Sequence, residues 1–584
     1  SLFTTPPTVK FAHEAEWCTL CHTPLKVQKT LKRKVITMHV GEFIAVETVK
    51  QCKKCGKQYR SEELCTIVPS GANFGYDVLV SIGRSLFLKH RNIEETIEYL
   101  KDNNIDICPR EVSFLGKKFI AYLATAHKQC SQRIKEAMQL KGGYVFHLDG
   151  TCEGEEPIVM SGLDSLTEIV LASIKIPSEN AEHIIPFLNK IKENYGTPAA
   201  LVHDMGKGIL KAVEEVFPAT PDFICQFHFL RDIGKDLLLA EYNTIRKCLK
   251  QYGIFSKLRY HLKQLKRHLD DNQELIDVFS DGFQEKKLSG VSLEKIPILN
   301  TYSLILWTLE GMKEGEGYGF PFDRPHLSFA KRLRIMFEHI DRFKEIELRE
   351  NWRDNKPYYR LFHKIKAIMK NQVLWNAVDA IESKIHVFEK LRAAMRIAPV
   401  KGRKGLNHNG MNVKIKTIEQ GVKSFCDWLV KKNKKEDKRE YKKMLSQIDK
   451  YWEKLFSDPI TVNTPAGTFE IQPQRTNNIL EQFFRSFKRG HRRKTGRTSL
   501  GPVFRAMLAE TPLVKNLENA QYMEMLLGDK SNLEEVFATI EIATIREQLQ
   551  EAHLVANRVP AKIKRIISQA DYPEKIAALI KKVS

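Results

Sequence analysis

The alternation of apolar and polar residues divides the chain into a β-rich start, an α/β middle and a long helical remainder. Short apolar runs bounded by turn residues are typical of buried strands, whereas apolar residues spaced by three and four are typical of helices. In the middle part these patterns predict strands at 144–149, 157–163 and 168–176, a helix at 179–194, a strand at 199–203, a helix at 207–216 and a strand at 222–227. Strands followed by alternating helices and strands indicate an α/β domain.

The first 70 residues carry two closely spaced cysteine pairs with strand-like runs between them. The four cysteines are Cys18, Cys21, Cys52 and Cys55. Two thiolates separated by two residues can hold one side of a tetrahedral Zn²⁺, so two such pairs complete a structural site for one ion. The alternating runs at 34–40 and 43–49 predict the strands of a zinc ribbon. His22 and Cys65 are alternative ligands that we do not favour.

Residues 71–142 are predicted to be helical. The segment comprises a helix start at 92–100, a turn at 104–109 and a second amphipathic helix that begins near Arg110 and carries Lys117 and Lys118. Two short helices joined by a tight turn suit a helix-turn-helix, whose second helix would enter the major groove of DNA. An ordinary helical hairpin that only packs explains the pattern almost equally well. The neighbouring zinc ribbon and the basic chain favour DNA binding.

The segment 239–470 is predicted to be a helical insertion with two glycine-rich breaks, at 311–323 and 399–410. Glycine-rich segments of this length inside a compact region are more often functional loops or linkers than neutral spacers. We expect the tryptophans Trp307, Trp352 and Trp375 to be core residues. The predicted domains are a zinc ribbon at 1–70, a helix-turn-helix at 71–142, an α/β core at 143–238, the insertion at 239–470, a last core helix at 471–512 and a helical end at 513–584.

The composition indicates a folded protein with a polyanionic partner. The chain has 584 residues, of which 42% are hydrophobic, and a net charge of +22. Such a basic balance favours nucleic acid as the partner. No apolar window is long enough for a membrane span, and the first residues lack the apolar core of a signal peptide. The 11 cysteines, four of them in pairs, favour a reducing compartment, so we expect a cytoplasmic protein.

Two aspartates follow apolar runs that the pattern places in one sheet. Asp149 ends the first predicted strand, and Asp204 ends the fourth. Three consecutive strands followed by helix, strand, helix and strand is the element order of the ribonuclease H-like fold. In that fold the first and fourth strands are neighbours, so the two carboxylates are predicted to meet. Carboxylate oxygens are the ligands that hard divalent cations prefer.

A third acid stands far downstream on a basic helix. Between Arg475 and Arg497, Glu481 is the single acid among eight lysines and arginines. Nearby positive charge lowers the pKa of a carboxyl group, so we expect Glu481 to be ionised and able to bind metal. An apolar stripe of Ile479, Phe483 and Phe487 is predicted to dock the helix on the sheet. The alternative is a surface helix with an incidental glutamate.

With these motifs, residues 144–500 resemble a DDE transposase of the bacterial insertion-sequence type, similar in pattern to zinc-ribbon, Mutator-like and hAT transposases. The resemblance rests on five motifs: His147-Leu-Asp149-Gly-Thr, Val202-His-Asp204-Met-Gly-Lys-Gly, Cys225-Gln-Phe-His228, Asn478-x-x-Glu481, and Lys488 seven residues further on. It implies a ribonuclease H-like core interrupted by a large all-α insertion. It also implies that the three acids bind two Mg²⁺ or Mn²⁺ ions, which can clamp the attacking and leaving oxygens of a phosphodiester.

The resemblance implies roles for further residues and partners. Cys225 and His228 would lie beside the active site, although a buried thiol with a hydrogen-bonded histidine is a plain alternative. Contacts with DNA phosphate would come from the basic residues Arg485, Lys488, Arg489, Arg492, Arg493, Lys117 and Lys118. Partners would be the transposon ends, target DNA and a second copy of the chain, and the resemblance implies a bacterial protein associated with the nucleoid. Where some families have an arginine four residues before the glutamate, this chain has Asn477, which puts a role for that position in doubt.

Two other functions are compatible with the same residues. One is a structure-specific DNA nuclease on the same fold. The other is a domesticated, non-catalytic DNA-binding protein. The alternative acids Glu153, Glu155, Glu156, Asp164 and Asp232 lie near the same strands, and we expect them to be solvated loop charges.

Overall fold

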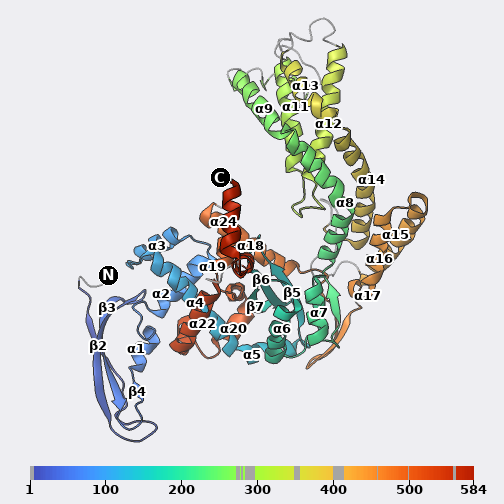
Figure 1. The fold of residues 1–584 in the computed structure, drawn as a ribbon. Coiled ribbons are helices and arrows are strands. Elements are labelled where there is room, and N and C mark those ends of the chain that lie inside the picture. Colours follow the sequence, from blue (N-terminus) through green and yellow to red (C-terminus); the bar gives the residue numbers. More distant parts are fainter. Residues whose placement is uncertain are drawn as a thin grey trace. The chain divides into compact units, whose positions relative to one another are not determined.

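A computed structural model gives the fold of this chain as a mixed α/β protein with two compact units (Figure 1). It describes residues 5–154, 156–270, 276–277, 280–282, 284, 296–346, 356–398, 414–456, 458–496, 499–556 and 561–583. The first unit comprises 1–222, 459–473 and 477–584, and the second comprises 223–458 and 474–476. The insertion was predicted at 239–470; the second unit begins earlier because its first helix runs without a break from Gln226 to Gln251.

The N-terminal part of the first unit is a small β-sheet in the order β1-β3-β2, with β4 also pairing β3. Its strands are β1 (Thr8–Ala12), β2 (Leu25–Thr37), β3 (Gly41–Cys52) and β4 (Gln58–Tyr59), and α1 (Glu62–Ile67) follows them. The predicted strand pair is confirmed as the antiparallel β2–β3 hairpin, which pairs from Leu25 opposite Cys52 to Thr37 opposite Gly41. Cys52 therefore lies at the open end of the hairpin, away from its turn, and Cys55 follows it.

A helical segment follows the sheet. It contains α2 (Tyr76–Gly83), the π-helix η1 (Arg84–Leu88), α3 (Ile93–Asp102), α4 (Pro109–Gln129) and α5 (Ser131–Leu140). A capping box begins α3, since the Asn92 side chain accepts from the Glu95 amide and the Glu95 carboxylate accepts from the Asn92 amide. The predicted helix–turn–helix order is therefore present.

The second helix of this pair is largely a core element. Most of α4 after Leu115 is buried; its exposed residues lie in the first turns, around Arg110, Phe114 and Lys117, and at its last two positions, Lys128 and Gln129. Lys118 is only 7% exposed, and its ammonium lies over the Tyr122 ring. Burial lowers the pKa of Lys118 to about 8. Lys118 was predicted to contact DNA; its burial leaves Lys117 as the lysine of this pair that a phosphate can reach.

The central sheet of the first unit has the order β7-β6-β5-β8-β9. Its strands are β5 (Val145–Thr151), β6 (Ile158–Asp164), β7 (Ile169–Ile176), β8 (Ala200–His203) and β9 (Asp222–Ile224). The first three strands pair antiparallel, and β5 pairs β8 in parallel. The prediction that the first strand neighbours the fourth is confirmed. The last strand is shorter than predicted, because the helix of the second unit already begins at Gln226.

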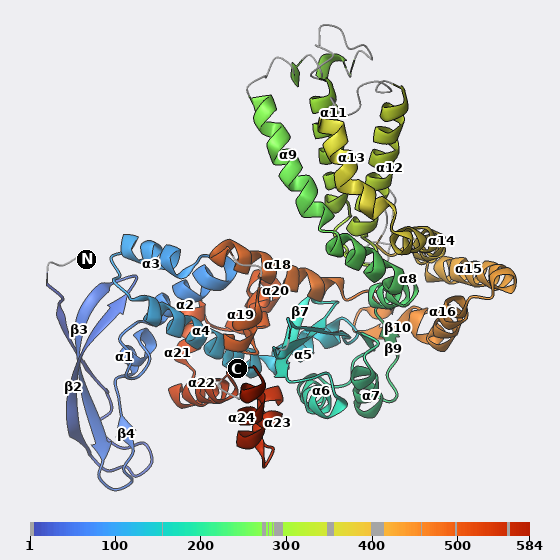
Figure 2. The same cartoon turned by 45° about the horizontal axis from the view of Figure 1, so that its top comes forward.

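Helices and a hairpin surround this sheet. The two crossover helices α6 (Ala181–Tyr195) and α7 (Lys207–Val216) pack on each other, as Figure 2 shows. The hairpin β10 (Ile460–Thr464) and β11 (Gly467–Ile471) precedes α18 (Asn478–Thr495). The remaining elements are α19 (Gly501–Ala506), η3 (Thr511–Glu518), α20 (Ala520–Leu527), α21 (Leu533–Ala538), α22 (Ile542–Ala556), α23 (Ala561–Ile567) and α24 (Tyr572–Val583).

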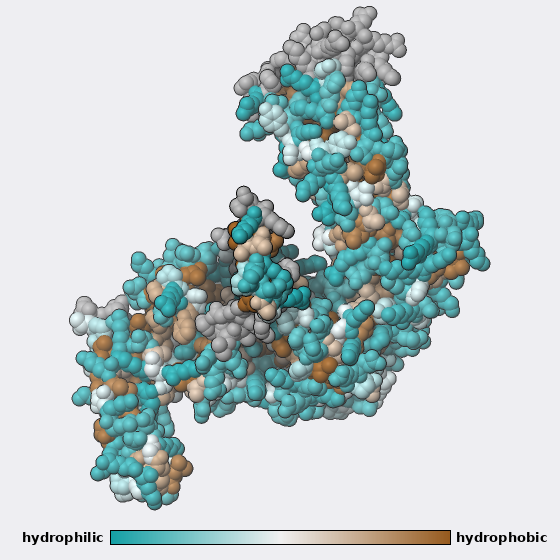
Figure 3. Space-filling model, in the orientation of Figure 1, coloured by the Kyte–Doolittle hydropathy of each residue, from teal (hydrophilic) through white to brown (hydrophobic). Residues whose placement is uncertain are grey.

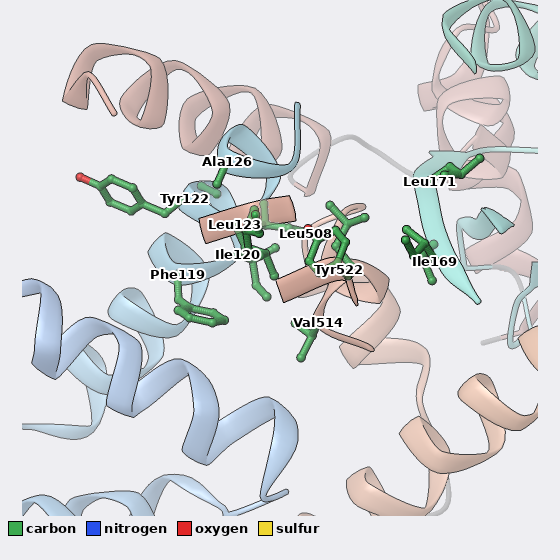
Figure 4. Packing of buried hydrophobic residues seen from close by; sticks show 14 of the residues in the cluster. Phe119, Ile120, Tyr122, Leu123, Ala126, Ile169, Leu171, Leu508, Val514 and Tyr522 are labelled. Carbon is green, nitrogen blue, oxygen red and sulfur yellow. The ribbon is translucent and has the colours of Figure 1, made fainter. Parts of the chain in front are cut away.

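One continuous core joins the helical segment to the sheet and to the C-terminal helices. Figure 4 shows residues of α4 facing Ile169 and Leu171 of β7 and Leu508, Val514 and Tyr522 of the C-terminal part. Within this core, His127 forms two hydrogen bonds: its Nδ1 lies 3.0 Å from the Tyr522 hydroxyl, and its Nε2 lies 2.8 Å from the Leu171 carbonyl oxygen. Burial lowers the pKa of His127 to about 4, so the ring is neutral.

The second unit is helical. It contains α8 (Gln226–Gln251), α9 (Ile254–Asp270), α11 (Ile296–Glu310), η2 (Gly311–Lys313), α12 (Pro325–Ile346), α13 (Lys356–Met369), α14 (Gln372–Met395), α15 (Ile415–Glu436), α16 (Arg439–Lys450) and α17 (Trp452–Leu455). Lys384 of α14 forms ion pairs with Glu241 of α8 at 2.8 Å and with Glu440 of α16 at 2.7 Å. These two ion pairs connect three helices. On the face that Figure 3 shows, hydrophilic residues predominate in both units.

The tryptophans of the second unit differ in burial. Trp375 is buried, as predicted, whereas Trp307 is 39% exposed and lies under the Arg332 guanidinium. Trp352 and the break at 399–410 lie outside the described residues. None of the described helices has a stretch both long and apolar enough to cross a membrane.

Candidate active site and zinc site

Strand register brings the two aspartates to the same level of the central sheet. In the parallel pair of β5 and β8, Val145 stands opposite Ala200 and His147 stands opposite Val202. Asp149 lies two residues beyond His147 and is still within β5. Asp204 lies two residues beyond Val202, directly after the end of β8. Neighbouring strands are about 4.8 Å apart, so the same register places the two backbone positions side by side.

The two aspartates differ in their surroundings. Asp149 is 5% exposed, and its carboxylate accepts a hydrogen bond of 2.9 Å from the Gly150 amide. Asp204 is half-buried. The preceding His203 is fully buried; it contacts the Asp204 carbonyl at 2.8 Å and the Asp222 carboxylate at 3.2 Å. These contacts fix the end of β8, from which Asp204 follows.

Asn477 joins the N-terminus of α18 to the middle of β5. Its amide Nδ2 donates to the Leu148 carbonyl at 2.9 Å, and its Oδ1 lies 3.0 Å from Nδ1 of His147. Asn477 is fully buried, and so is Leu148. Both bonds reach the two residues that immediately precede Asp149, so the helix start is held at the level of the aspartates.

The contact with Asn477 sets the protonation of His147. Since Nδ2 of Asn477 is the donor to Leu148, its Oδ1 must accept, and His147 must carry its proton on Nδ1. Burial lowers the pKa of His147 to about 4, although the bond to Asn477 opposes this shift. The ring is therefore neutral at physiological pH. Its Nε2 has no hydrogen-bond partner within the described ranges.

Glu481 lies one helical turn beyond this anchor. Its amide donates to the Asn477 carbonyl at 3.0 Å, and side chains four apart occupy one face of a helix. The Glu481 side chain is 19% exposed and forms an ion pair of 3.3 Å with Arg485, one further turn along. The first of the predicted basic residues is therefore paired with the third acid itself.

The buried face of α18 is centred beside the predicted stripe of Ile479, Phe483 and Phe487. Ile479 and Phe487 are half-buried and pack against core clusters, but the side chains buried in the described part of the helix are those of Leu480 and Phe484. Phe487 stacks on Phe504 of α19 with ring centroids 6.1 Å apart. Spacing alone was consistent with several faces of this helix, and the anchor at Asn477 selects one of them. The side chain of Phe483 is outside the described residues.

The far half of α18 carries the predicted basic residues. All four are exposed: Lys488, Arg489, Arg492 and Arg493. Lys494 differs, since its ammonium donates to the Leu86 carbonyl of η1 and is largely buried. Burial lowers its pKa to about 8. Lys494 therefore fixes the helix to the N-terminal helical segment, while the four exposed cations remain accessible to a polyanion.

Cys225 and His228 belong to the second unit. Cys225 caps the start of α8, and His228 lies in the first turn of that helix. Both side chains are buried. Their predicted role beside the acids stays a prediction that rests on the resemblance.

The described alternative acids form hydrogen bonds or ion pairs with other parts of the chain. Asp164 was expected to be a solvated loop charge, but it is fully buried and accepts from the Val145, Leu166 and Thr167 amides, which builds the β6–β7 turn. Glu156 pairs with Arg505. Asp232 pairs with Lys235 in α8, Glu153 accepts from the Leu500 amide, and Glu155 lies outside the described residues.

The four predicted zinc ligands converge. The Sγ atoms of Cys18, Cys21, Cys52 and Cys55 all lie within 4.8 Å of one another. Tetrahedral Zn–S bonds of about 2.3 Å require sulfurs about 3.8 Å apart, and Cys18 and Cys55 are separated by 3.6 Å. The donor set therefore fits one structural Zn²⁺ ion.

The surroundings of Cys18 and Cys52 favour the thiolate form, whereas the contact with Cys55 raises the pKa of Cys21. The Cys21 amide lies 3.4 Å from Cys18 Sγ, and the Cys55 amide lies 3.5 Å from Cys52 Sγ. The Tyr59 hydroxyl donates to Cys18 and lowers the pKa of that thiol to about 6. The disfavoured ligands His22 and Cys65 are not members of the cluster.

Comparisons with known proteins leave the family of this chain open. No protein-family model matches it, and no curated protein matches it in sequence. Among solved structures, it is similar to the catalytic core domain of HTLV-2 integrase in complex with magnesium. That likeness has 15% sequence identity and a TM-score of 0.13, and it covers 32% of this chain and 95% of the other. A likeness of this quality carries no functional argument, and the strand order and the contacts of Asn477 stand independently of it.

Sequence reasoning missed Asn477 and the contact role of His147. His147 stood within a recognised motif, whereas Asn477 lies just before the Asn478-x-x-Glu481 motif and was judged only by its departure from arginine. One signal for this contact was available in the sequence. Asn477 is a polar residue at a predicted helix start, and His147 is a polar residue on a predicted buried strand. Buried polar side chains are nearly always hydrogen-bonded, so two of them in elements that pack together indicate a pair.

Proposed function

We propose that this chain is a DNA transposase of the DDE type, with Asp149, Asp204 and Glu481 as its metal-binding acids. The observation that carries the proposal is the combination of the shared register of the two aspartates with the Asn477 contact to β5. Together these features supply two carboxylates from adjacent strands and a third from the helix anchored beside them. The strand order, with β5 central and parallel to β8, is that of the ribonuclease H-like fold.

The three acids would act by holding two divalent cations in fixed positions. When bound, two divalent cations activate the attacking oxygen and stabilise the leaving oxygen of the phosphodiester. Carboxylate oxygens suit Mg²⁺ or Mn²⁺. The low exposure of Asp149 limits its contact with water, which strengthens its attraction for a cation. Positioning and charge stabilisation, rather than a covalent intermediate, would supply the rate.

The substrate class follows from the cations that surround the acids. Arg485 lies one turn beyond Glu481, and the exposed cations of α18 continue along the same helix. Such a row can neutralise successive phosphates of a DNA strand. The zinc ribbon and the first turns of α4, with Lys117, would hold the transposon end. Cutting two ends together favours a homodimer.

The decisive experiment is a cleavage assay on the DNA that flanks the gene, where a transposon would carry its terminal inverted repeats. The wild-type chain should nick these ends with Mg²⁺ or Mn²⁺, and Glu481→Gln should bind them without nicking. A second assay should offer pre-cut 3′ ends and an intact plasmid. Strand transfer supports a transposase, whereas cleavage without transfer identifies a nuclease. Binding with no metal-dependent reaction in the wild-type chain would identify a non-catalytic DNA-binding protein.

A further inference from the structure

Residues 84–91, between α2 and α3, pack against the far half of α18. The Lys494 ammonium donates to the Leu86 carbonyl of this segment. The His90 ring lies directly on the backbone of α18, since a Cβ at Gly490 would collide with it. Both segments belong to the first unit, so these contacts fix one against the other.

This segment is itself held in a defined conformation. The Lys89 amide donates to the Arg84 carbonyl at 3.0 Å, and the Arg91 amide donates to the Ser85 carbonyl at 3.0 Å. The Arg91 guanidinium lies 4.4 Å from the centre of the Tyr99 ring of α3, and the Lys89 ammonium lies 5.7 Å from the same centre. Its cations are therefore positioned in advance, which lowers the entropic cost of binding an anion.

Six cations on and beside this contact are exposed: Arg84, Lys89, Lys488, Arg489, Arg492 and Arg493. Arg489 and Arg493 flank the contact, because they directly precede Gly490 and Lys494, the two residues of α18 that make it. None of the six forms an ion pair within the described ranges, whereas Arg485, one turn before Arg489, pairs with Glu481.

The pKa of His90 reports the sign of the charge at the contact. Burial, and then the charge of Lys494, lower this pKa, and Arg493 lowers it further. Glu518 of η3 opposes the shift without reversing it. The local field is therefore positive.

The carboxylates of this region do not neutralise the six cations. Glu95 is engaged in the capping box of α3, and Glu518 lines a cavity of about 260 Å³ between η1 and α18. Glu94 and Glu98 are exposed on α3. None of these four forms an ion pair in the part of the chain that the structure describes, and the cations outnumber them.

An array of unpaired cations on two fixed segments favours a polyanion over a single carboxylate. Duplex DNA carries one negative charge per about 1.7 Å of its axis, so such an array can release several of its counterions at once. The array also leads to the candidate active site. Glu481 lies on the same helix, seven residues or about 10 Å along the axis before Lys488.

We propose that Arg84 and Lys89 bind the phosphate backbone of double-stranded DNA, on one surface with the exposed cations of α18. The N-terminal helical segment then contacts DNA through the turn before α3, in addition to the first turns of α4. The choice of DNA as the polyanion rests on the proposed function, whereas the positive surface does not.

The test measures binding of the full chain to three labelled polyanions, in the Glu481→Gln background so that DNA remains intact. The probes are one duplex DNA of mixed sequence, the single-stranded RNA of the same sequence, and poly-glutamate. Anisotropy over a salt series gives the affinity and its salt dependence. The melting temperature shows that each variant is folded.

Lys89→Ala and Arg493→Ala each remove one exposed cation, from the two sides of the contact. Lys128→Ala is the matched control, since Lys128 is an exposed lysine of the same unit that also forms no ion pair in the described part of the chain. It lies on α4, twelve residues or about 18 Å along the helix beyond Gly116, which packs against Leu86.

Lys89→Ala and Arg493→Ala should each weaken binding of the duplex about threefold and lower the slope of log affinity against log salt by about 1. Lys128→Ala should leave both unchanged. A wild-type slope for the duplex in Lys89→Ala would overturn the proposal, and so would an equal loss in Lys128→Ala. An effect of Lys89→Ala confined to RNA or poly-glutamate would also overturn it and would identify that polyanion as the partner.

This outcome is separable from that of the proposed function. A chain that cleaves no DNA but loses duplex affinity in Lys89→Ala has this surface without the proposed activity. A chain that transposes and keeps the wild-type salt slope in Lys89→Ala has the proposed activity without this surface.

Discussion

The three acids reach their places by two different physical routes. Asp149 and Asp204 are positioned by hydrogen-bonded register between β5 and β8, a constraint that many backbone bonds share. Glu481 is positioned by a helix whose start depends on the two bonds of Asn477. The register is therefore shared among many backbone bonds, whereas at the start of α18 a single side chain, Asn477, supplies both bonds to β5. A single side chain should be able to displace the third acid while the first two stay in place.

The largest effect should come from the acids themselves. Asp149→Asn and Glu481→Gln should each lower metal-dependent cleavage by about a thousandfold or more, which corresponds to the several kcal/mol that a metal clamp supplies. Both variants should keep the melting temperature and the DNA affinity. Single-turnover cleavage of the inverted repeats measures the loss. Cleavage within tenfold of wild type in either variant would remove that acid from the site.

The next effect distinguishes the two routes. Asn477→Ala leaves the Leu148 carbonyl and the His147 Nδ1 without a partner, so it should cost about 1–3 kcal/mol of unfolding free energy. It should also lower cleavage by about a hundredfold, because a displacement near 1 Å is enough for such a loss. Asn477→Asp keeps the acceptor for His147 and should recover part of the rate.

Asn516 provides the matched control for that variant. It is also fully buried, and it exchanges two hydrogen bonds of 2.8 Å with Val170 on β7, at the opposite edge of the sheet from β8. Asn516→Ala should cost a similar free energy of unfolding while the cleavage rate per folded molecule stays at the wild-type value. Equal loss of cleavage in both variants would mean that Asn477 acts only through stability.

Acid should weaken the first unit through its buried histidines. The pKa values of His127 and His147 fall from the ordinary 6.5 to about 4. Below pH 6.5 the unfolded chain binds protons that the folded chain does not bind until about pH 4, so stability is present above 6.5 and is lost as pH falls towards 4. At pH 5 the loss should be about 2 kcal/mol per histidine.

Urea unfolding between pH 7 and 5 measures this loss. In His127→Gln, the pH-dependent part should fall by about half, because His147 still contributes. A slope that is unchanged in this variant would show that His127 does not titrate on unfolding as expected. The two histidines differ in their contacts, since of the two only His147 is hydrogen-bonded to Asn477 at the start of α18.

The smallest effect should come from the exposed end of α18. Lys488→Ala should weaken binding to duplex DNA a few-fold and reduce the salt slope by about 1, without changing cleavage at saturating DNA. Lys530→Ala is the control, since this exposed lysine of the same unit pairs with Asp529. Anisotropy over a salt series measures both. A salt slope that matches wild type in Lys488→Ala would place Lys488 off the DNA.

Local pattern was enough to predict several elements of the fold. The predicted helix at 207–216 coincides with α7, and the strand pair of the ribbon is present as β2 and β3. Each of these features follows from nearby residues: an apolar period, a turn, or a cysteine spacing. The buried face of α18 and the burial of Lys118 could not be predicted in this way, because contacts with distant segments decided them.

The sequence by itself determined the composition of the candidate sites. It identified four zinc-type cysteines, two aspartates at strand ends and one glutamate in a basic helix, because residue type and spacing are local properties. Tertiary structure decided which atoms meet. It placed Asn477 on β5 and turned Leu480 and Phe484 into the core. Those contacts span hundreds of residues, and only the burial of both partners gives them their energy.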